Sequence, residues 1–183
     1  CCKVLFDFFT TGTYDRNRDF ILTTSPSMDI LISSNLERLI YLSAGCDAAV
    51  NAAMMEELST KGSYTVTPAM RDFMKDFQGG YASEEENKAV IKKVFEDTGY
   101  LIDTHTGVAS AVYEAYKAES GDERKTVIAS TASPYKFSGS VLEALEGAES
   151  KEDEFAVIDR LAQLSGMAIP QAVEEIRTAS VRH

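Results

Sequence analysis

The sequence predicts an α/β fold that is rich in helices and contains part of a doubly wound, mostly parallel sheet. Short apolar stretches alternate with helical periodicity between Tyr64 and Leu145, which is the pattern of successive strand and helix units. Only a few of these stretches are convincing strands, whereas helical segments are numerous. We therefore expect a portion of such a sheet, with helices flanking it.

The composition is that of an ordinary globular domain of 183 residues, with 44% hydrophobic and 26% charged residues. A formal net charge of -11 argues against a nucleic-acid or membrane surface, because both need clustered Lys and Arg. Cys1, Cys2 and Cys46 make no disulfide framework and no Cys/His cluster, so we expect no metal site. No apolar run reaches the roughly 18 residues of a membrane span. These features favour the cytoplasm.

Periodicity and capping residues predict most of the helices. A helix should begin at Asp47, run to about Lys61 and stop at Gly62. Ser83 and Glu86 form a capping box at the start of another long helix. Further helices are expected over residues 68–77, 108–118, 140–145, 153–164 and 170–177.

Three short apolar stretches predict strands: Tyr64–Val66, Tyr100–Ile102 and Thr126–Ala129. The last is the strongest candidate, because it is a run of mostly β-branched residues that stops abruptly at a polar segment. Between the second and third strands, Asp103–Gly107 should form a compact polar turn.

The stretch Thr24–Leu39 is unusually polar for the start of a helix, where one capping residue suffices. It offers Ser25, Ser27, Asp29, Ser33, Ser34 and Asn35 before an apolar-periodic run. A capped core helix behind a polar turn is one interpretation. The other is a binding surface, because Asn35 and Arg38 lie on one side of the helix start and a guanidinium can clamp a phosphate. A salt bridge from Arg38 to Asp29, to Glu37 or to a neighbouring helix is the alternative role for that arginine.

The segment Ser130–Phe137 follows the strongest predicted strand, at the sheet edge where ligands collect in open α/β folds. Three Ser/Thr hydroxyls and Lys136 occur within it. A polar strand-to-helix connection would explain the segment equally well, with Lys136 as a solvated lysine. Both interpretations stay open on the chemistry of the residues alone.

Three stretches closely resemble segments of bacterial threonine synthases, which use pyridoxal phosphate. They are Ser25–Ile30 with Ser33–Leu39 (SPSMDI and SSNLERL), Thr131–Phe137 (TASPYKF) and Leu101–Ala109 (LIDTHTGVA). In the family the last stretch usually has proline where this sequence has Thr104. The resemblance extends from about Val4 to Arg182.

The resemblance implies that the chain is an incomplete large domain of a fold type II pyridoxal phosphate enzyme. In that class a hydroxyl faces the pyridine nitrogen; Thr131 matches this role, with Ser130 next in line. The family's substrate is O-phosphohomoserine. The candidate substrate-binding residues are Ser27, Asp29, Asn35, Arg38 and Lys136. His105 should support the site structurally, and we expect the three stretches to line one pocket.

Two parts of the family's machinery have no counterpart in this sequence. The Schiff-base lysine and the Gly-rich loop for the cofactor phosphate lie upstream in the family, so no catalytic residue is assigned here. We expect residues 1–183 to be a single carboxyl-terminal portion of a threonine synthase whose amino-terminal half is absent. The fragment alone should bind little or no cofactor and be inactive. Because it exposes surface that the absent half should cover, it should self-associate or be partly unstable.

The resemblance implies that the intact enzyme is a carbon–oxygen lyase acting on phosphates. It would convert O-phosphohomoserine and water to threonine and phosphate in threonine biosynthesis. Another fold type II enzyme, such as a serine or threonine dehydratase, is one alternative. A non-catalytic interaction domain of the same fold is the other.

Overall fold

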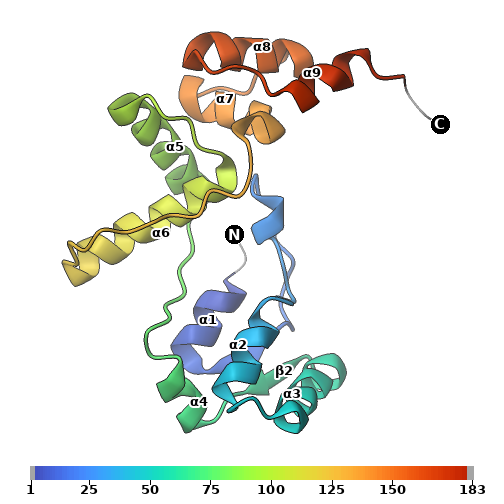
Figure 1. Cartoon of the computed structure of the whole chain (residues 1–183), viewed down its shortest axis with the longest axis vertical. Helices are drawn as coiled ribbons and strands as arrows, with labels where there is room; N and C mark the ends of the chain where they lie inside the picture. The colour runs from blue at the N-terminus through green and yellow to red at the C-terminus, as the bar shows by residue number, and fades with distance from the viewer. Residues whose placement is uncertain (1–2, 181–183) are drawn as a thin grey trace. The chain divides into compact units, whose positions relative to one another are not determined.

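The chain divides into two compact units, Cys1–Tyr81 and Ala82–His183, in a computed structural model that describes residues 3–180 (Figure 1). Cys1, Cys2 and Arg182, which entered the sequence-based expectations, lie outside the described residues. The first unit contains α1 (Val4–Thr11), β1 (Thr13–Asp15), the 3₁₀ turn η1 (Pro26–Met28), α2 (Leu36–Ser43), α3 (Ala48–Lys61), β2 (Ser63–Thr65) and α4 (Pro68–Phe73).

A small antiparallel hairpin organises the core of the first unit. Tyr14 of β1 pairs with Tyr64 of β2, and the two rings stack with centroids 5.4 Å apart. Burial raises the pKa of Tyr64, and the nearby groups of Tyr14 and Glu37 raise it further, so the Tyr64 hydroxyl stays neutral. Helices and the segments next to α4 surround the pair with Val4, Phe8, Leu36, Ile40, Met54, Leu58, Val66, Met70 and Met74.

The hydroxyl of Tyr14 also holds the polar stretch that precedes α2. It donates a hydrogen bond to the carbonyl oxygen of Leu31 (3.0 Å) and accepts one from the backbone N–H of Ser33 (2.7 Å). This stretch makes few regular backbone hydrogen bonds of its own, so a buried side chain satisfies its polar groups instead. The stacked tyrosine pair thereby fixes the path of the chain into α2.

The second unit contains helices and no strand in its described residues, 82–180. It contains α5 (Glu84–Thr98), α6 (Thr104–Ser120), η2 (Pro134–Phe137), α7 (Ser138–Glu146), α8 (Glu154–Ser165) and α9 (Gln171–Thr178). Its core consists of Val90, Ile91, Leu101, Ile102, Tyr135, Val141, Leu142, Ala144, Val157, Ile158 and Leu161. A two-pronged pair between Arg177 and Asp159 ties α9 to α8 and lowers the pKa of Asp159.

The structure confirms the helices that were predicted from capping chemistry. The carboxylate of Asp47 accepts hydrogen bonds at the start of α3, and Gly62 ends that helix with φ +79°. The Ser83–Glu86 capping box is present at the start of α5, where its hydrogen bonds lower the pKa of Glu86. The helices predicted near 140–145, 153–164 and 170–177 correspond to α7, α8 and α9.

The expected doubly wound, mostly parallel sheet is not present in residues 3–180, where the sheet has two antiparallel strands. The prediction at Tyr64–Val66 is confirmed as β2, but Tyr100–Ile102 and Thr126–Ala129 are not strands. A strand needs a neighbour for its backbone hydrogen bonds, and neither stretch has one in the described chain. Leu101 and Ile102 are buried between helices, whereas Val127 is 94% exposed.

Two local predictions were also wrong in detail. Asp103–Gly107 is not a separate turn, because Asp103 caps α6 and the next four residues form its first turn. The polar stretch Thr24–Leu39 is mostly outside α2, and Asn35 at the N-cap position makes no side-chain capping bond. The helix after Pro68 ends at Phe73 rather than near residue 77.

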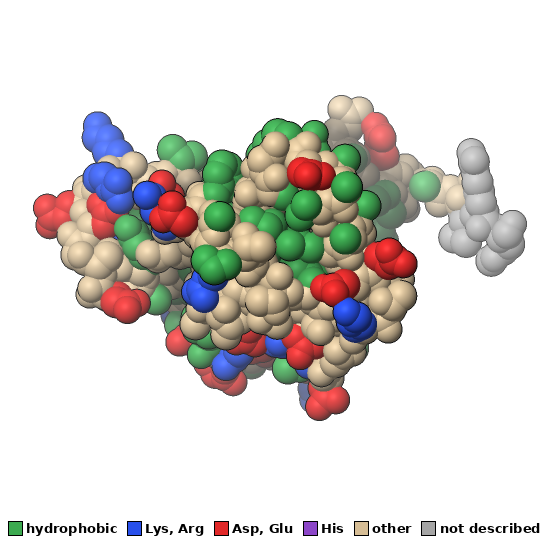
Figure 2. All heavy atoms as spheres, turned by 90° about the horizontal axis from the view of Figure 1, so that it is seen from below, with side chains coloured by type: hydrophobic (Ala, Val, Ile, Leu, Met, Phe, Trp, Pro, Cys, Tyr) green, Lys and Arg blue, Asp and Glu red, His purple; other side chains and the backbone are tan. Residues whose placement is uncertain are grey.

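Large apolar side chains are exposed in both units. They are Phe20, Ile21, Leu22, Ile32, Tyr41, Leu42, Val50, Phe73, Phe77, Tyr81, Tyr100, Val127, Leu164 and Ile176. Figure 2 shows hydrophobic side chains gathered on the face seen from below, with acidic and basic groups interspersed and no continuous basic area on that face. No helix within residues 3–180 combines the length and apolarity that crossing a membrane requires.

Replacing Gly107 with alanine should destabilise the second unit. The new Cβ would lie 2.2 Å from Oδ1 of Asn87 and 2.9 Å from Cγ1 of Ile91, both of which are buried. We expect a loss of about 1–3 kcal/mol in the free energy of unfolding, from overpacking between α5 and α6. The matched control is Gly139→Ala in α7, where a Cβ meets nothing within 4 Å and helix propensity should add up to about 1 kcal/mol. Urea unfolding followed by circular dichroism measures both, and equal stabilities would contradict the close packing.

Candidate functional site

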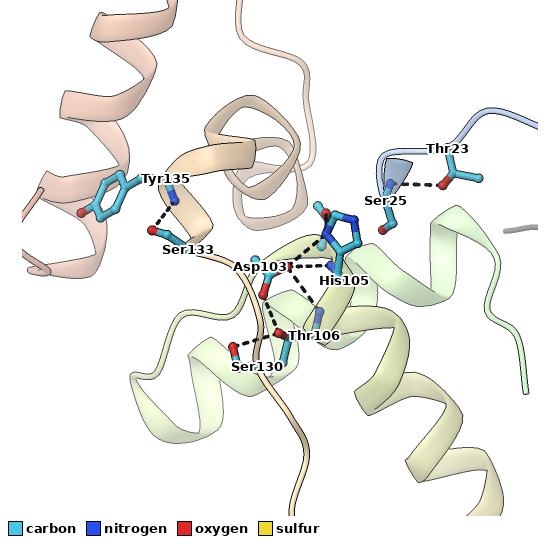
Figure 3. Close-up of polar contacts among 9 residues, drawn as sticks. Thr23, Ser25, Asp103, His105, Thr106, Ser130, Ser133 and Tyr135 are labelled. Atoms are coloured by element: carbon cyan, nitrogen blue, oxygen red, sulfur yellow. Dashed lines mark hydrogen bonds and ion pairs between the residues drawn. The ribbon is translucent and has the colours of Figure 1, made fainter. Parts of the chain in front are cut away.

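The carboxylate of Asp103 organises the start of α6. It is fully buried and accepts hydrogen bonds from the backbone N–H groups of His105 (2.9 Å) and Thr106 (3.4 Å). Its second oxygen accepts the hydroxyl of Thr106, which also contacts the hydroxyl of Ser130 at 2.9 Å. Figure 3 shows this chain of contacts running from the cap of α6 to the segment before η2. Asp103 thus links a helix start to one of the predicted cofactor-binding residues.

His105 lies inside the same cluster as a structural group. Its Nδ1 is 3.2 Å from Oδ1 of Asp103, and its ring lies 4.7 Å from the ring of Phe137, centroid to centroid. The side chain is almost fully buried. This geometry agrees with the supporting role expected from the sequence, because the imidazole helps to hold the carboxylate in place.

Thr131 lies between two anchored points of the chain. On one side, Ser130 is held by Thr106. On the other, Ser133 accepts the backbone N–H of Tyr135 (3.3 Å), whose buried ring donates its hydroxyl to the carbonyl of Met167 (2.7 Å). Thr131 itself is exposed. The backbone at Thr131 is thus held on both sides, while the residue itself is open to solvent.

Asp29 is buried and shapes the loop in which it lies. Its two carboxylate oxygens accept the backbone N–H (2.7 Å) and the hydroxyl (2.8 Å) of Thr23, whose hydroxyl in turn accepts the N–H of Ser25 (3.1 Å). Ser27, between these residues, is exposed. Of the two, Ser27 is the one open to solvent, whereas both carboxylate oxygens of Asp29 are already in use within the loop.

Asn35 and Arg38 contact each other at the start of α2, as their spacing predicts. The Arg38 guanidinium donates to Oδ1 of Asn35, and both side chains are exposed. None of the ion pairs found in the described residues involves Arg38, so the salt bridges to Asp29 or Glu37 are not formed. One bond to Asn35 orients the guanidinium and leaves most of its five N–H donors open to solvent.

Lys136 borders a cleft of about 400 Å³ around the start of α7. The other lining residues include the carboxylates of Glu143, Glu149, Glu152 and Glu154. Glu143 is paired with Lys88 (2.7 Å), but the other three carboxylates make the cleft acidic, which weakens the case for Lys136 as a phosphate ligand. In the described residues 3–180, no group of three or more His, Cys, Asp or Glu side chains is placed to hold a metal ion.

Three polar residues central to this arrangement were not singled out from the sequence: Thr23, Asp103 and Thr106. The capping role of Asp103 could have been predicted, since an aspartate just before an apolar-periodic run is typical of a helix N-cap. Thr106 and Thr23 were not, because their partners Ser130 and Asp29 are recognised only once the chain has folded.

The comparisons with known proteins converge on one family. Residues 106–182 match the family described as threonine synthase, C-terminal. Threonine synthase-like 1 from Pongo abelii is 36% identical over 151 residues, which are 81% of this chain and 20% of that protein.

Two solved structures resemble this chain along most of its length. Yeast threonine synthase gives a TM-score of 0.78 at 30% identity, covering 97% of this chain and 36% of that one. The PLP-bound threonine synthase from Brucella melitensis gives 0.66 at 30% identity, covering 85% and 33%. The chain is therefore a homologue of enzymes built on the pyridoxal phosphate fold. More particularly, it is a homologue of the threonine synthases, and it spans about a third or less of the length of these relatives.

Replacing Asp29 with alanine should loosen the Thr23–Asp29 loop. Loss of the buried acceptor leaves the N–H and hydroxyl of Thr23 without their partner, which costs about 1–3 kcal/mol in the free energy of unfolding. Amide hydrogen exchange at Thr23 and thermal unfolding measure the effect. The control is Ser27→Ala, an exposed change in the same loop that should stay within about 0.5 kcal/mol. Similar effects from both substitutions would count against the anchoring role of Asp29.

Proposed function

We propose that this chain is the carboxyl-terminal portion of a threonine synthase. The observation that carries the proposal is the structural match to yeast threonine synthase over 97% of the chain, together with the family match over residues 106–182. The reaction is the conversion of O-phosphohomoserine and water to threonine and phosphate, which is a carbon–oxygen lyase reaction followed by hydration.

The activity belongs to a longer protein. Because the chain covers 36% of the yeast enzyme, residues 1–183 form one portion, and the lysine that binds the cofactor and the phosphate-binding loop belong to the other. The partner of this chain is that amino-terminal portion, which would also cover exposed apolar side chains such as Val127. Alone, the chain should be inactive, bind little or no cofactor and self-associate.

The residues near Ser130 and Thr131 fit pyridoxal phosphate in one respect. The ring nitrogen of this cofactor needs a polar partner, and Thr131 offers an exposed hydroxyl between two anchored positions. When bound, pyridoxal phosphate supplies an electron sink for breaking bonds next to the substrate's amino group. A neutral hydroxyl opposite the nitrogen does not hold a proton there, which moderates that sink.

The Asn35–Arg38 pair is the proposed clamp for the substrate phosphate. Asn35 orients the guanidinium, whose planar fork of donors matches phosphate oxygens in a bidentate manner. Ser27 adds an exposed hydroxyl, and Asp29 contributes by holding the loop that carries it. Lys136 is a further candidate for binding the substrate, but the glutamates that line the same cleft disfavour a phosphate there. The exposed, free thiol of Cys46 suits the reducing cytoplasm as the compartment.

The reaction is tested with a longer protein that contains this chain and the upstream portion. Supplied with pyridoxal phosphate and O-phosphohomoserine, it should release phosphate and form threonine, whereas the isolated chain should do neither. Phosphate release and threonine are assayed together. Deamination of serine or threonine without phosphate release would identify a dehydratase instead. Absence of cofactor binding and of any turnover would indicate a non-catalytic protein of the same fold.

Replacing Arg38 with glutamine in that longer protein should weaken binding of the phosphorylated substrate. Loss of a charge-assisted pair is expected to raise KM roughly 10- to 100-fold, with a smaller effect on kcat. The matched control is Arg124→Gln, since Arg124 is also exposed but is bonded to Asp122 in a loop. If the two arginine variants have the same KM, the clamp is not at Arg38.

A further inference from the structure

The side chains of Asp103, Thr106 and Ser130 are joined by two hydrogen bonds, and the donor of each can be assigned. The carboxylate of Asp103 lies at the N-terminus of α6, where it accepts two backbone N–H groups. Thr106 has a single hydroxyl proton and Ser130 has another. The two contacts to explain are Thr106 to Asp103 and Thr106 to Ser130 (Figure 3).

Only one arrangement of these protons satisfies both contacts. A carboxylate can only accept, so Thr106 donates its proton to Asp103. The oxygen of Thr106 then has only lone pairs left for Ser130, and the Ser130 hydroxyl must donate to it across 2.9 Å. The Ser130 oxygen can still accept a hydrogen bond, but its only hydroxyl proton is used and cannot be donated to a ligand.

We propose that Asp103 and Thr106 are positioning residues. They hold the Ser130 hydroxyl as a donor to Thr106, which leaves the hydroxyl of Thr131 as the donor to the ring nitrogen of the cofactor. The proposal rests on the proposed function and deepens it, since the family resemblance alone left two adjacent hydroxyls as candidates. Ser130 then serves as an anchor. Thr131, whose hydroxyl is exposed, contacts the ligand.

The anchor is rigid because of what surrounds Asp103. The carboxylate is 0% exposed, is held by two backbone N–H groups and lies 3.2 Å from Nδ1 of His105. Buried polar groups with all partners satisfied hold one geometry, because any rearrangement leaves a group unpaired. The position of Ser130 is therefore set by the start of α6 rather than by its own exposed segment.

The direction of the hydrogen bonds from Ser130 to Thr106 to Asp103 is tested first on the 183-residue chain itself. Replacing Thr106 with valine keeps the shape of the side chain and removes the hydroxyl. We expect the Ser130 side chain, which should hold one rotamer in the parent protein, to average over several in Thr106→Val. NMR coupling constants of Ser130 measure this. Thr106→Ser should restore the single rotamer, and Thr126→Val, at an exposed threonine in the same segment, should leave it unchanged.

An unchanged Ser130 rotamer in Thr106→Val, or no recovery in Thr106→Ser, would overturn the anchor. If Thr106→Val fails to fold, Ser130→Ala provides the second measurement, because Ser130 is exposed and its removal should spare the fold. In that variant we expect amide exchange at Thr131 and Ala132 to become at least about 3-fold faster, in line with the loss of one hydrogen bond. Unchanged exchange would contradict the anchor as well.

The assignment of the donor is tested in the longer protein loaded with pyridoxal phosphate. Thr131→Val should change the absorbance spectrum of the bound cofactor. Ser130→Ala and Thr106→Val should keep the spectrum and weaken cofactor binding roughly 3- to 10-fold. A spectral change in Ser130→Ala but not in Thr131→Val would reverse the assignment. If the longer protein binds no pyridoxal phosphate, the proposed function and the role of Thr131 both fail, while the NMR measurement still decides whether the anchor exists.

Discussion

The buried carboxylate of Asp103 is the interaction on which the second unit's candidate site depends. It caps α6, receives the hydroxyl of Thr106 and, through it, sets the position of Ser130. A carboxyl group this deeply buried needs hydrogen-bond donors around it, and the N-terminus of a helix supplies such donors. The same group therefore stabilises a helix and places a ligand-facing segment, which couples the stability of the unit to the geometry of the site.

In the first unit, too, side chains provide hydrogen-bond partners for polar groups that regular secondary structure leaves unpaired. Its long polar stretch before α2 has little regular secondary structure, so its backbone polar groups need side-chain partners. Asp29 satisfies Thr23, and the hydroxyl of Tyr14 bridges Leu31 and Ser33. Because the ring of Tyr14 is held by stacking on Tyr64, the path of the loop follows from the hairpin. The polar stretch before α2 offered more capping residues than one helix needs. In the structure it forms a defined loop, held by Asp29 and Tyr14, that leads to Asn35 and Arg38 at the start of α2.

The predictions succeeded and failed for different physical reasons. Asp47, Ser83 and Gly62 were interpreted correctly because capping and helix termination depend on neighbours within four residues along the chain. Thr126–Ala129 was predicted as a strand because its β-branched residues favour one, yet a strand exists only with a neighbour to pair with. The parallel sheet was inferred from this strand and from Tyr100–Ile102, so it failed together with them in residues 3–180.

The sequence by itself determined the resemblance to threonine synthases, the positions of most helices, the caps of α3 and α5, and the Asn35–Arg38 pair, because each depends on residues that are close together along the chain. The tertiary structure decided which polar groups are used internally and which remain open to a ligand. Both carboxylate oxygens of Asp29 accept from Thr23, and the exposed Lys136 shares its cleft with four glutamates. Thr131 and Arg38 are exposed as well, and neither lines that acidic cleft. The direction of the Asp103–Thr106–Ser130 chain belongs to this second class, since Ser130 is 24 residues from Thr106 and meets it only through folding.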